Sequence, residues 1–168
     1  MARITLFRHA KAEVPSTQKD DFERILTTRG RRNADRMGRF ISENGLLPDL
    51  VIVSAAARTR ETYELAATHW PDLPVILSDS IYEASATTIM TAIEAHGGDK
   101  QHVMVIGHNP GLVVLLLHLV DPSQAHTNLS YFPTSCIADI AFDSRTINQI
   151  DPDEGRLCSF ARVRELED

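Results

Sequence analysis

Short hydrophobic runs alternate along the chain with longer segments whose hydrophobic residues recur at helical spacing. The hydrophobic runs predict strands at residues 4–7, 50–53, 75–77 and 102–106, the first of them buried. The segments with helical periodicity predict helices at residues 28–44, 58–69, 86–96 and 112–120. Strand and helix therefore alternate four times, which is typical of a parallel sheet with helices on both faces.

The last third of the chain has a different pattern. Residues 136–142 and 157–163 alternate between hydrophobic and polar positions, which predicts antiparallel strands at one edge of the sheet. At the first predicted helix, Thr28 is the expected cap and Gly45 the expected stop. With no linker or repeat in the sequence, we expect one α/β domain over residues 1–168. Its predicted architecture is a three-layer α/β/α sandwich with a mostly parallel sheet.

The composition is that of an ordinary globular protein. The chain has 168 residues, of which 43 % are hydrophobic and 24 % charged, with a net charge of −6. These values disfavour disordered and fibrous classes and argue against a general nucleic-acid binder. No hydrophobic stretch approaches the ~20 residues of a membrane span, and no secretory signal precedes the first strand. We therefore expect a cytoplasmic protein with no membrane contact.

Arginine dominates the basic residues, and most of it lies in the first 60 positions. The planar guanidinium fork suits oxyanions better than the lysine ammonium does. This distribution predicts a phosphate site built from the first half of the chain. The two cysteines, Cys136 and Cys158, are too few for a disulfide framework and are expected to be small core residues.

Three predicted strands end in residues that suit such a site: Arg8 and His9 after the first, residues 54–58 after the second, and His108 after the strand at 102–106. Ligands bind outside the carboxyl ends of strands in open parallel sheets, so these side chains are expected to converge. Arg58 falls in the first turn of a helix, where a cation opposes the helix dipole, and a bound anion would relieve that conflict. Each residue taken alone could equally be an ordinary polar loop or helix residue.

The residues around these positions resemble the histidine phosphatase superfamily, the phosphoglycerate-mutase-like proteins. The matching segments occur in order at residues 6–13 (LFRHAKAE), 26–30 (LTTRG), 54–62 (SAAARTRET), 81–86 (IYEASA) and 105–110 (VIGHNP). The Arg-His-Ala form of the first segment is similar to that of SixA-type phosphohistidine phosphatases. Ala10 departs from the glycine usual in the superfamily. The resemblance covers residues 2–142 and implies a phosphoglycerate-mutase-like fold.

The resemblance also implies roles for the candidate residues. His9 would be the nucleophile that becomes a phosphohistidine, while Arg8 and Arg58 would hold the phosphoryl oxygens. His108, protonated or donating a hydrogen bond, would complete the pocket. Phosphoryl transfer depends mainly on positioning and charge stabilisation, so a ring of cationic donors around a nucleophilic nitrogen suffices. Repulsion from that ring is expected to keep His9 partly neutral. No cofactor and no metal is expected.

Glu83 is the candidate general acid, although an exposed glutamate near a helix start is an equally good interpretation. An imidazole leaving group has a pKa near ~6.5, so a phosphohistidine phosphatase depends less on an acid than a phosphomonoesterase does. The spacing from Cys158 to Arg164 matches that of cysteine phosphatases. The segment lacks glycine and alternates like a strand, so that interpretation is rejected. The arginines between Arg29 and Arg39 form either a substrate-docking face or, as we favour, a solvated helix face partly paired with Asp35 and Glu43.

The segments between the matched motifs are short, which predicts an open groove that admits a phosphorylated side chain of another protein. The leading hypothesis is a phosphatase acting on phosphohistidine in a phosphorelay or phosphotransfer protein, through a covalent enzyme intermediate. One alternative is a phosphatase of small-molecule esters or phosphopeptides that uses the same residues. A distant alternative is a phosphate-binding module without turnover, which the presence of both His9 and His108 disfavours.

Overall fold

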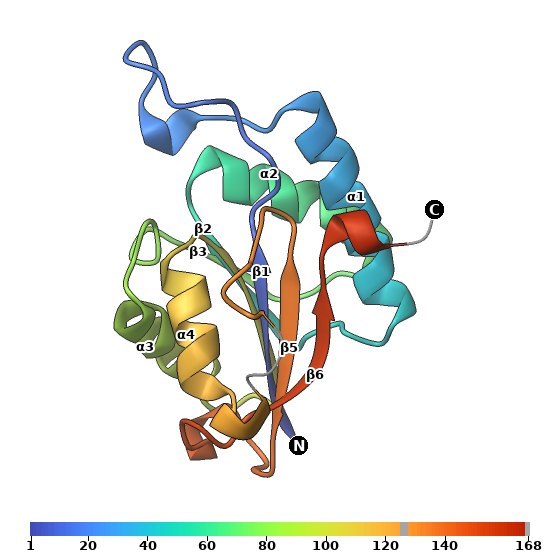
Figure 1. Ribbon diagram of the computed structural model, residues 1–168, viewed down its shortest axis with the longest axis vertical. Coiled ribbons are helices and arrows are strands. Elements are labelled where there is room, and N and C mark those ends of the chain that lie inside the picture. The colour runs from blue at the N-terminus through green and yellow to red at the C-terminus, as the bar shows by residue number, and fades with distance from the viewer. Residues whose placement is uncertain (125–127, 167–168) are drawn as a thin grey trace.

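The computed structural model of the protein describes residues 1–124 and 128–166. Its centre is a six-stranded sheet in the order β3-β2-β4-β1-β5-β6 (Figure 1). The strands are β1 (Ala2–Arg8), β2 (Leu50–Ser54), β3 (Val75–Ser78), β4 (His102–Gly107), β5 (Ile137–Phe142) and β6 (Arg156–Ala161). The pairs among β1 to β4 are parallel, whereas β5 and β6 are antiparallel additions beside β1. The prediction of a mostly parallel sheet with antiparallel strands at one edge is confirmed.

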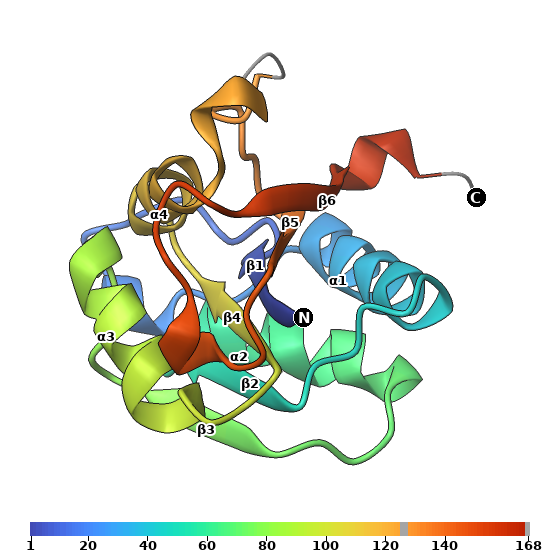
Figure 2. The ribbon, with the colours of Figure 1, turned by 90° about the horizontal axis from the view of Figure 1, so that it is seen from below.

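Helices cover both faces of this sheet (Figure 2). α1 (Thr28–Glu43) and α2 (Ala57–Ala66) pack on one face, and α3 (Ala86–Gly97) and α4 (Gly111–Leu119) on the other. Side chains of the central strands point alternately into the two layers: Ile4 and Leu6 join the core under α3 and α4, and Phe7 joins the core under α1 and α2. Two buried faces explain why these strands are continuous hydrophobic runs. The predicted three-layer α/β/α sandwich is confirmed.

Several boundaries differ from the prediction. The cap of α1 is Thr27, whose side chain accepts a hydrogen bond from the amide of Gly30, and Thr28 is already helical. The predicted helix at 58–69 is α-helical only to Ala66 and ends in a 3-10 turn over 67–69. Either of two adjacent threonines can cap, so sequence alone does not decide between them.

The second correction concerns the C-terminal strand. β6 ends at Ala161, two residues before the predicted end at position 163, and a 3-10 turn follows at Val163–Glu165. Cys136 is fully buried as expected, but Cys158 is exposed and is not a core residue. β6 is the edge strand of the sheet, and along it the exposed Arg156 and Cys158 alternate with partly buried residues, so the alternating pattern places Cys158 on the exposed face.

A polar network lies inside the sheet, near the start of β1. Asp139 on β5 is fully buried opposite Thr5, whose hydroxyl donates to Asp139 Oδ1 at 2.7 Å. Arg3 forms an ion pair with the same carboxylate. His102 Nε2 lies 2.7 Å from the Thr5 oxygen, and since the hydroxyl proton is given to Asp139, this nitrogen is the donor. The buried carboxylate is therefore both paired and hydrogen-bonded, as burial of a charge requires.

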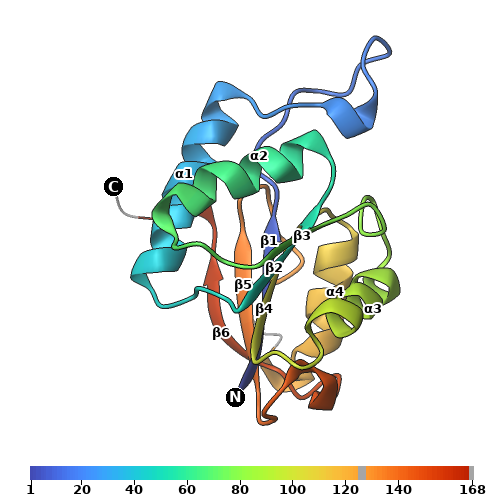
Figure 3. The same ribbon diagram turned by 180° about the vertical axis from the view of Figure 1, so that it is seen from behind.

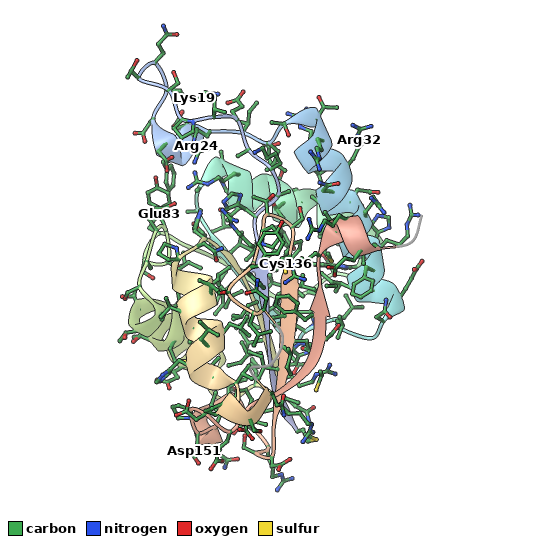
Figure 4. All side chains as sticks on the ribbon, viewed as in Figure 1. Lys19, Arg24, Arg32, Glu83, Cys136 and Asp151 are labelled. Carbon is green, nitrogen blue, oxygen red and sulfur yellow. The ribbon has the colours of Figure 1, made fainter. Side chains whose placement is uncertain are left out.

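The carboxyl ends of the parallel strands meet at one end of the molecule. α2 crosses the sheet near that end, seen from behind in Figure 3. The side chains of Arg24 and Glu83 lie there as well, whereas Asp151 marks the opposite end (Figure 4). Among the described residues, no helix has both the length and the apolar character needed to cross a membrane.

Candidate active site

The last rung of the ladder between β1 and β4 brings two histidines together. Arg8 is paired with Gly107, and the amide of His9 donates to the Gly107 carbonyl at 3.1 Å. The next residue on each strand is a histidine, so His9 and His108 leave the sheet side by side. Their ring centroids lie 5.3 Å apart, with the ring planes tilted by 53°. Both side chains are buried.

The hydrogen bond of His9 defines which ring nitrogen is free. Nδ1 lies 2.8 Å from the carbonyl oxygen of Ala10. A carbonyl only accepts, so Nδ1 carries the proton and Nε2 of the neutral ring keeps its lone pair. Burial lowers the pKa of His9 to about 3, with smaller contributions from His108, Arg8 and Arg58. His9 is therefore neutral, as expected, but burial rather than cationic repulsion is the main cause.

Arg58 is almost completely buried and lies in the first turn of α2. Its Nη1 donates to the backbone oxygen of Asp21 at 2.8 Å. Its Nη2 donates to Glu83 Oε1 at 2.7 Å and to Asp21 Oδ2 at 3.2 Å. Two carboxylates thus balance a cation that opposes the helix dipole. The buried Nε has no hydrogen-bond partner within the described parts of the chain.

Arg8 is held from the opposite side of the sheet. Its Nη1 donates to the carbonyl of Phe132 at 3.2 Å, in the loop that leads to β5. That loop also folds back on the strand end, because the amide of Ser135 donates to the carbonyls of Arg8 and His9. Burial lowers the pKa of Arg8, and its Nε has no partner in the described structure. An arginine with a buried, unsatisfied donor is suited to an added oxyanion.

His108 faces Ser54 and Glu83. Its Nε2 lies 2.7 Å from the Ser54 hydroxyl, at the end of β2, and its Nδ1 is 3.6 Å from Glu83 Oε1. Burial lowers the pKa of His108 to about 3, and the charge of Arg58 acts in the same direction. His108 is consequently a neutral imidazole in this arrangement, so of the two expected states, a protonated ring or a ring that donates a hydrogen bond, the second remains. One nitrogen of a neutral ring still donates a hydrogen bond.

Glu83 lies at the rim of this group, and its side chain is 47 % exposed. One carboxylate oxygen contacts both the buried Arg58 and the His108 ring. Its backbone has a φ of +50°, a conformation that is uncommon outside glycine and that occurs often at functional sites. All five residues predicted from the sequence, His9, His108, Arg8, Arg58 and Glu83, are therefore parts of one connected cluster.

The structure adds two residues to which the sequence analysis gave no role. Asp21 lies in a 3-10 turn at Asp21–Glu23, and the Tyr82 hydroxyl donates to its carboxylate. The Tyr82 and His108 rings pack nearly perpendicular to each other, with centroids 5.5 Å apart. This hydrogen bond, with Arg24 and Arg58 nearby, lowers the pKa of Asp21 to about 2. Asp21 follows no predicted strand, and no local pattern separates it from its acidic neighbours. Tyr82 lies inside the matched segment at residues 81–86, and that match is the sequence signal that could have identified it.

Thr62 links two parts of the cluster. Its hydroxyl accepts from the amide of Ala10 at 3.0 Å and donates to the carbonyl of Arg58 at 2.7 Å. Both bonds are buried. The residue that follows His9 is thereby tied to the first turn of α2. Within the residues that the structure describes, no group of three or more histidine, cysteine, aspartate or glutamate side chains has the arrangement of a metal site.

The sequence matches a known family and a bacterial relative. The model of the histidine phosphatase superfamily (branch 1) matches residues 4–89, which include His9, Arg58 and Glu83. The chain belongs to the histidine phosphatase superfamily. It is also 33 % identical over 136 residues to an uncharacterized protein of Mycobacterium tuberculosis, a match that covers 78 % of this chain and 84 % of the relative.

Solved structures of the histidine phosphatase superfamily share the fold. A protein from Agrobacterium tumefaciens, described as the phosphohistidine phosphatase SixA, superposes with a TM-score of 0.83 at 29 % identity, over 96 % of this chain and 97 % of that one. The protein histidine phosphatase SixA complexed with tungstate superposes with a TM-score of 0.79 at 19 % identity, over 98 % and 99 % of the two chains. The second likeness bears on the fold alone. The expected phosphoglycerate-mutase-like fold is confirmed, and family and fold mark this protein as a phosphatase.

Proposed function

We propose that the protein removes the phosphoryl group from phosphohistidine in other proteins and that His9 carries the phosphoryl group in between. The observation that carries the proposal is the state of His9. Its Nδ1 proton is given to a backbone carbonyl, so the other ring nitrogen holds a lone pair on an imidazole that stays neutral at physiological pH. A positioned, unprotonated nitrogen is what a nucleophile for phosphorus requires.

Two guanidinium groups support the same interpretation. Arg8 and Arg58 approach from different elements, and each has a buried Nε with no partner among the described residues. Fixed cationic donors in a buried site stabilise the charge spread over the oxygens of a transferring phosphoryl group. The nucleophile and the two cationic donors are all side chains of this chain.

The reaction consists of two displacements. In the first, the His9 Nε2 lone pair forms a bond to phosphorus while the bond between phosphorus and the substrate imidazole nitrogen breaks. The substrate ring carries a proton on its other nitrogen, so it takes the bonding pair and leaves as neutral imidazole, while the phosphorylated His9 ring, which keeps its Nδ1 proton, becomes the cation. In the second, the oxygen of a water molecule attacks phosphorus, the bond to His9 breaks, and inorganic phosphate leaves. One water proton passes to a phosphoryl oxygen, so the phosphate leaves as dihydrogen phosphate, and the bonding pair returns to Nε2, which restores the neutral His9 ring. A buried, unprotonated His9 matches both the start and the end of this cycle.

The choice of phosphohistidine rests on the leaving group and on the neighbours. The conjugate acid of the leaving imidazole has a pKa near ~6.5, far below the pKa of an alcohol, so departure of the imidazole needs little help from a general acid. Glu83, the one candidate acid named from the sequence, is engaged by Arg58 and lies half exposed at the rim. The superposition on the SixA protein of Agrobacterium tumefaciens at 29 % identity favours the same substrate class. A protein-borne phosphohistidine also suits a rim formed by exposed side chains.

The test is rapid quenching with a protein phosphorylated on histidine with labelled phosphate. We expect an acid-labile adduct on His9, located by mass spectrometry at neutral to alkaline pH, with rapid decay to free phosphate. His9→Gln should form no adduct and lose turnover by at least about 10³-fold. An adduct on another residue, or turnover of His9→Gln within a few-fold of wild type, overturns the mechanism. Faster turnover of simple phosphate esters than of phosphohistidine favours the alternative ester phosphatase.

A further inference from the structure

A basic cleft lies beside the candidate active site and has no part in the chemistry described above. It has a volume of about 240 Å³ and is bordered by the first turns of α1, the loop before β5 and the segment after β6. These three segments lie side by side in Figure 1. The cleft is lined by Lys11, Arg29, Asn33, Tyr131, Pro133, Thr134, Arg162, Val163 and Arg164. Four of these residues are cations in a chain whose net charge is −6.

Three of the four cations have no carboxylate partner. Lys11, Arg29 and Arg164 are exposed and form no ion pair with any residue that the structure describes. Arg162 differs, because it donates to the carbonyls of Tyr131 and Asn128 and pairs with Glu165 at 3.1 Å. Elsewhere on α1 two arginines do find carboxylates, since Arg31 lies 3.4 Å from Glu61 and Arg39 4.0 Å from Asp35, whereas the exposed Arg32 has none among the described residues. The cleft therefore gathers positive charge that the fold leaves unneutralised.

Contacts on two sides hold the walls of the cleft in place. Arg162 and Arg164 stack on the Tyr131 ring at 4.8 and 5.0 Å, which fixes the aromatic side of the cleft. On the other side, the Lys11 carbonyl accepts from the amide and hydroxyl of Thr27. Gly30 packs so closely on this carbonyl that a Cβ at that position would lie 2.0 Å from it. The backbone that bears Lys11 is thereby held against the start of α1.

The same walls connect to the nucleophile. Lys11 is two residues after His9, so their Cα atoms are at most about 7 Å apart. The opposite wall contains Thr134, and the amide of the next residue, Ser135, donates to the His9 carbonyl at 3.1 Å. A chain segment whose phosphorylated side chain reaches His9 would thus pass over or next to the cleft.

We infer that this basic cleft binds acidic side chains that flank the phosphorylated residue of a protein substrate. The inference rests on the proposed function, which supplies a protein substrate, and adds the chemistry of its neighbouring residues. Unneutralised cations favour carboxylates, while the half-exposed Tyr131 ring and the Asn33 side chain offer the mixed contacts that a peptide uses. The arginine cluster of α1 is accordingly divided: Arg29 serves docking, and Arg31 and Arg39 belong to a solvated, paired face.

The experiment uses two synthetic peptides phosphorylated on one histidine. One has glutamate and aspartate on both sides of that histidine, and its twin has glutamine and asparagine. Wild type should hydrolyse the acidic peptide with a kcat/KM about tenfold higher, mainly through a lower KM, and added salt should remove the difference. The triple variant Lys11→Ala, Arg29→Ala, Arg164→Ala should lose the preference and hydrolyse phosphoramidate, which has no peptide, as wild type does.

Two further variants distinguish a loss of acidic-peptide binding from a general loss of structure. Arg29→Glu reverses one charge in the first turn of α1, where an acidic side chain favours the helix, so it should fold and should disfavour the acidic peptide. Arg32→Ala removes an exposed arginine of the same helix that does not line the cleft, and it should keep the preference. A wild type without preference, or a preference that survives in both the triple variant and Arg29→Glu, overturns the inference.

The same comparison with phosphoserine peptides separates this inference from the proposed function. If wild type leaves phosphohistidine intact but hydrolyses the acidic phosphoserine peptide in preference to its neutral twin, the cleft assignment holds and the phosphohistidine assignment fails. If phosphohistidine is hydrolysed with equal efficiency in both peptides, the phosphohistidine assignment holds and the cleft assignment fails.

Discussion

Arg58 Nη2 lies 3.2 Å from Oδ2 of Asp21, and the backbone oxygen of the same aspartate accepts from Nη1 at 2.8 Å. The arginine is buried in α2, while the aspartate belongs to a short turn 37 positions earlier in the chain, with its side chain 42 % exposed. The segment between the first strand and α1 therefore fixes the guanidinium on which phosphate binding would depend. Asp21 is a positioning residue, because it acts through Arg58.

Replacing Asp21 by asparagine should loosen this arrangement without unfolding the protein. The amide keeps the shape but loses the charge that pairs with Arg58 and accepts from Tyr82. We expect kcat/KM on a phosphohistidine substrate to fall roughly ten- to hundredfold, since small displacements of a positioning group are costly in phosphoryl transfer. Glu23→Gln in the same turn is the control, because Glu23 is exposed and outside the cluster. Equal activity of the two variants would contradict the assignment.

Glu83→Gln should separate the substrates by their leaving groups. Amide substitution removes the ability to donate a proton but keeps a hydrogen-bonding side chain at the rim. Hydrolysis of phosphohistidine should fall roughly ten- to hundredfold, as for Asp21→Asn, because Arg58 again loses a charged partner, whereas esters of poorly acidic alcohols should lose a further factor of about 10²–10⁴. A series of aryl and alkyl phosphates measured with both proteins gives the dependence on leaving-group pKa. Identical dependence in wild type and variant would show that Glu83 donates no proton.

The stability of the protein should fall with acid because of two histidines. The folded pKa of His9 and of His108 is about 3, below the ordinary value of 6.5, so the unfolded state binds more protons between these limits. Their contribution is unchanged above pH 6.5 and declines as the pH falls toward 3, by up to about 2 kcal/mol per histidine at pH 5. Urea unfolding at pH 7 and 5 measures it. His9→Gln should show a smaller loss than wild type; an equal loss refutes the low pKa of His9.

A separate prediction concerns the buried carboxylate in the sheet. Asp139→Ala removes the shared partner of Arg3 and Thr5, leaving polar groups buried without it. We expect a loss of about 3 kcal/mol in the free energy of unfolding, the usual cost of breaking a buried pair. Asp143→Ala, at an exposed position just after the same strand, should cost less than about 1 kcal/mol. Comparable unfolding midpoints for the two variants would show that the network adds little stability.

The framework of the fold was predictable because hydrophobic periodicity is a local property. The run at 102–106 and the break at Gly107 place His108 at the carboxyl end of a parallel strand, and the same logic places His9. Convergence of these residues follows from a general rule of parallel sheets. Motif resemblance then added Glu83, which no periodicity separates from other glutamates.

What sequence reasoning missed are contacts made across long loops. Asp21 reaches Arg58 through the path of a segment with few hydrophobic positions, and nothing local encodes that path. Sequence reasoning also attributed the neutrality of His9 to nearby cations, whereas burial lowers its pKa most. The loop before β5 and α2 both contact the backbone at His9 and Ala10, and sequence alone does not place them there. The wrong placement of Cys158 has a similar reason: a strand pattern does not reveal whether a layer covers it.

The hydroxyl of Thr62, which bridges the Ala10 amide and the Arg58 carbonyl, has a consequence for how the enzyme could be tuned. This one oxygen atom joins the segment that follows β1, which bears His9, to α2, which bears Arg58. Valine has nearly the same size as threonine but can form neither hydrogen bond. A Thr62→Val change, by natural variation or by design, would therefore loosen the geometry of the site while the chain retains every side chain proposed to contact the substrate.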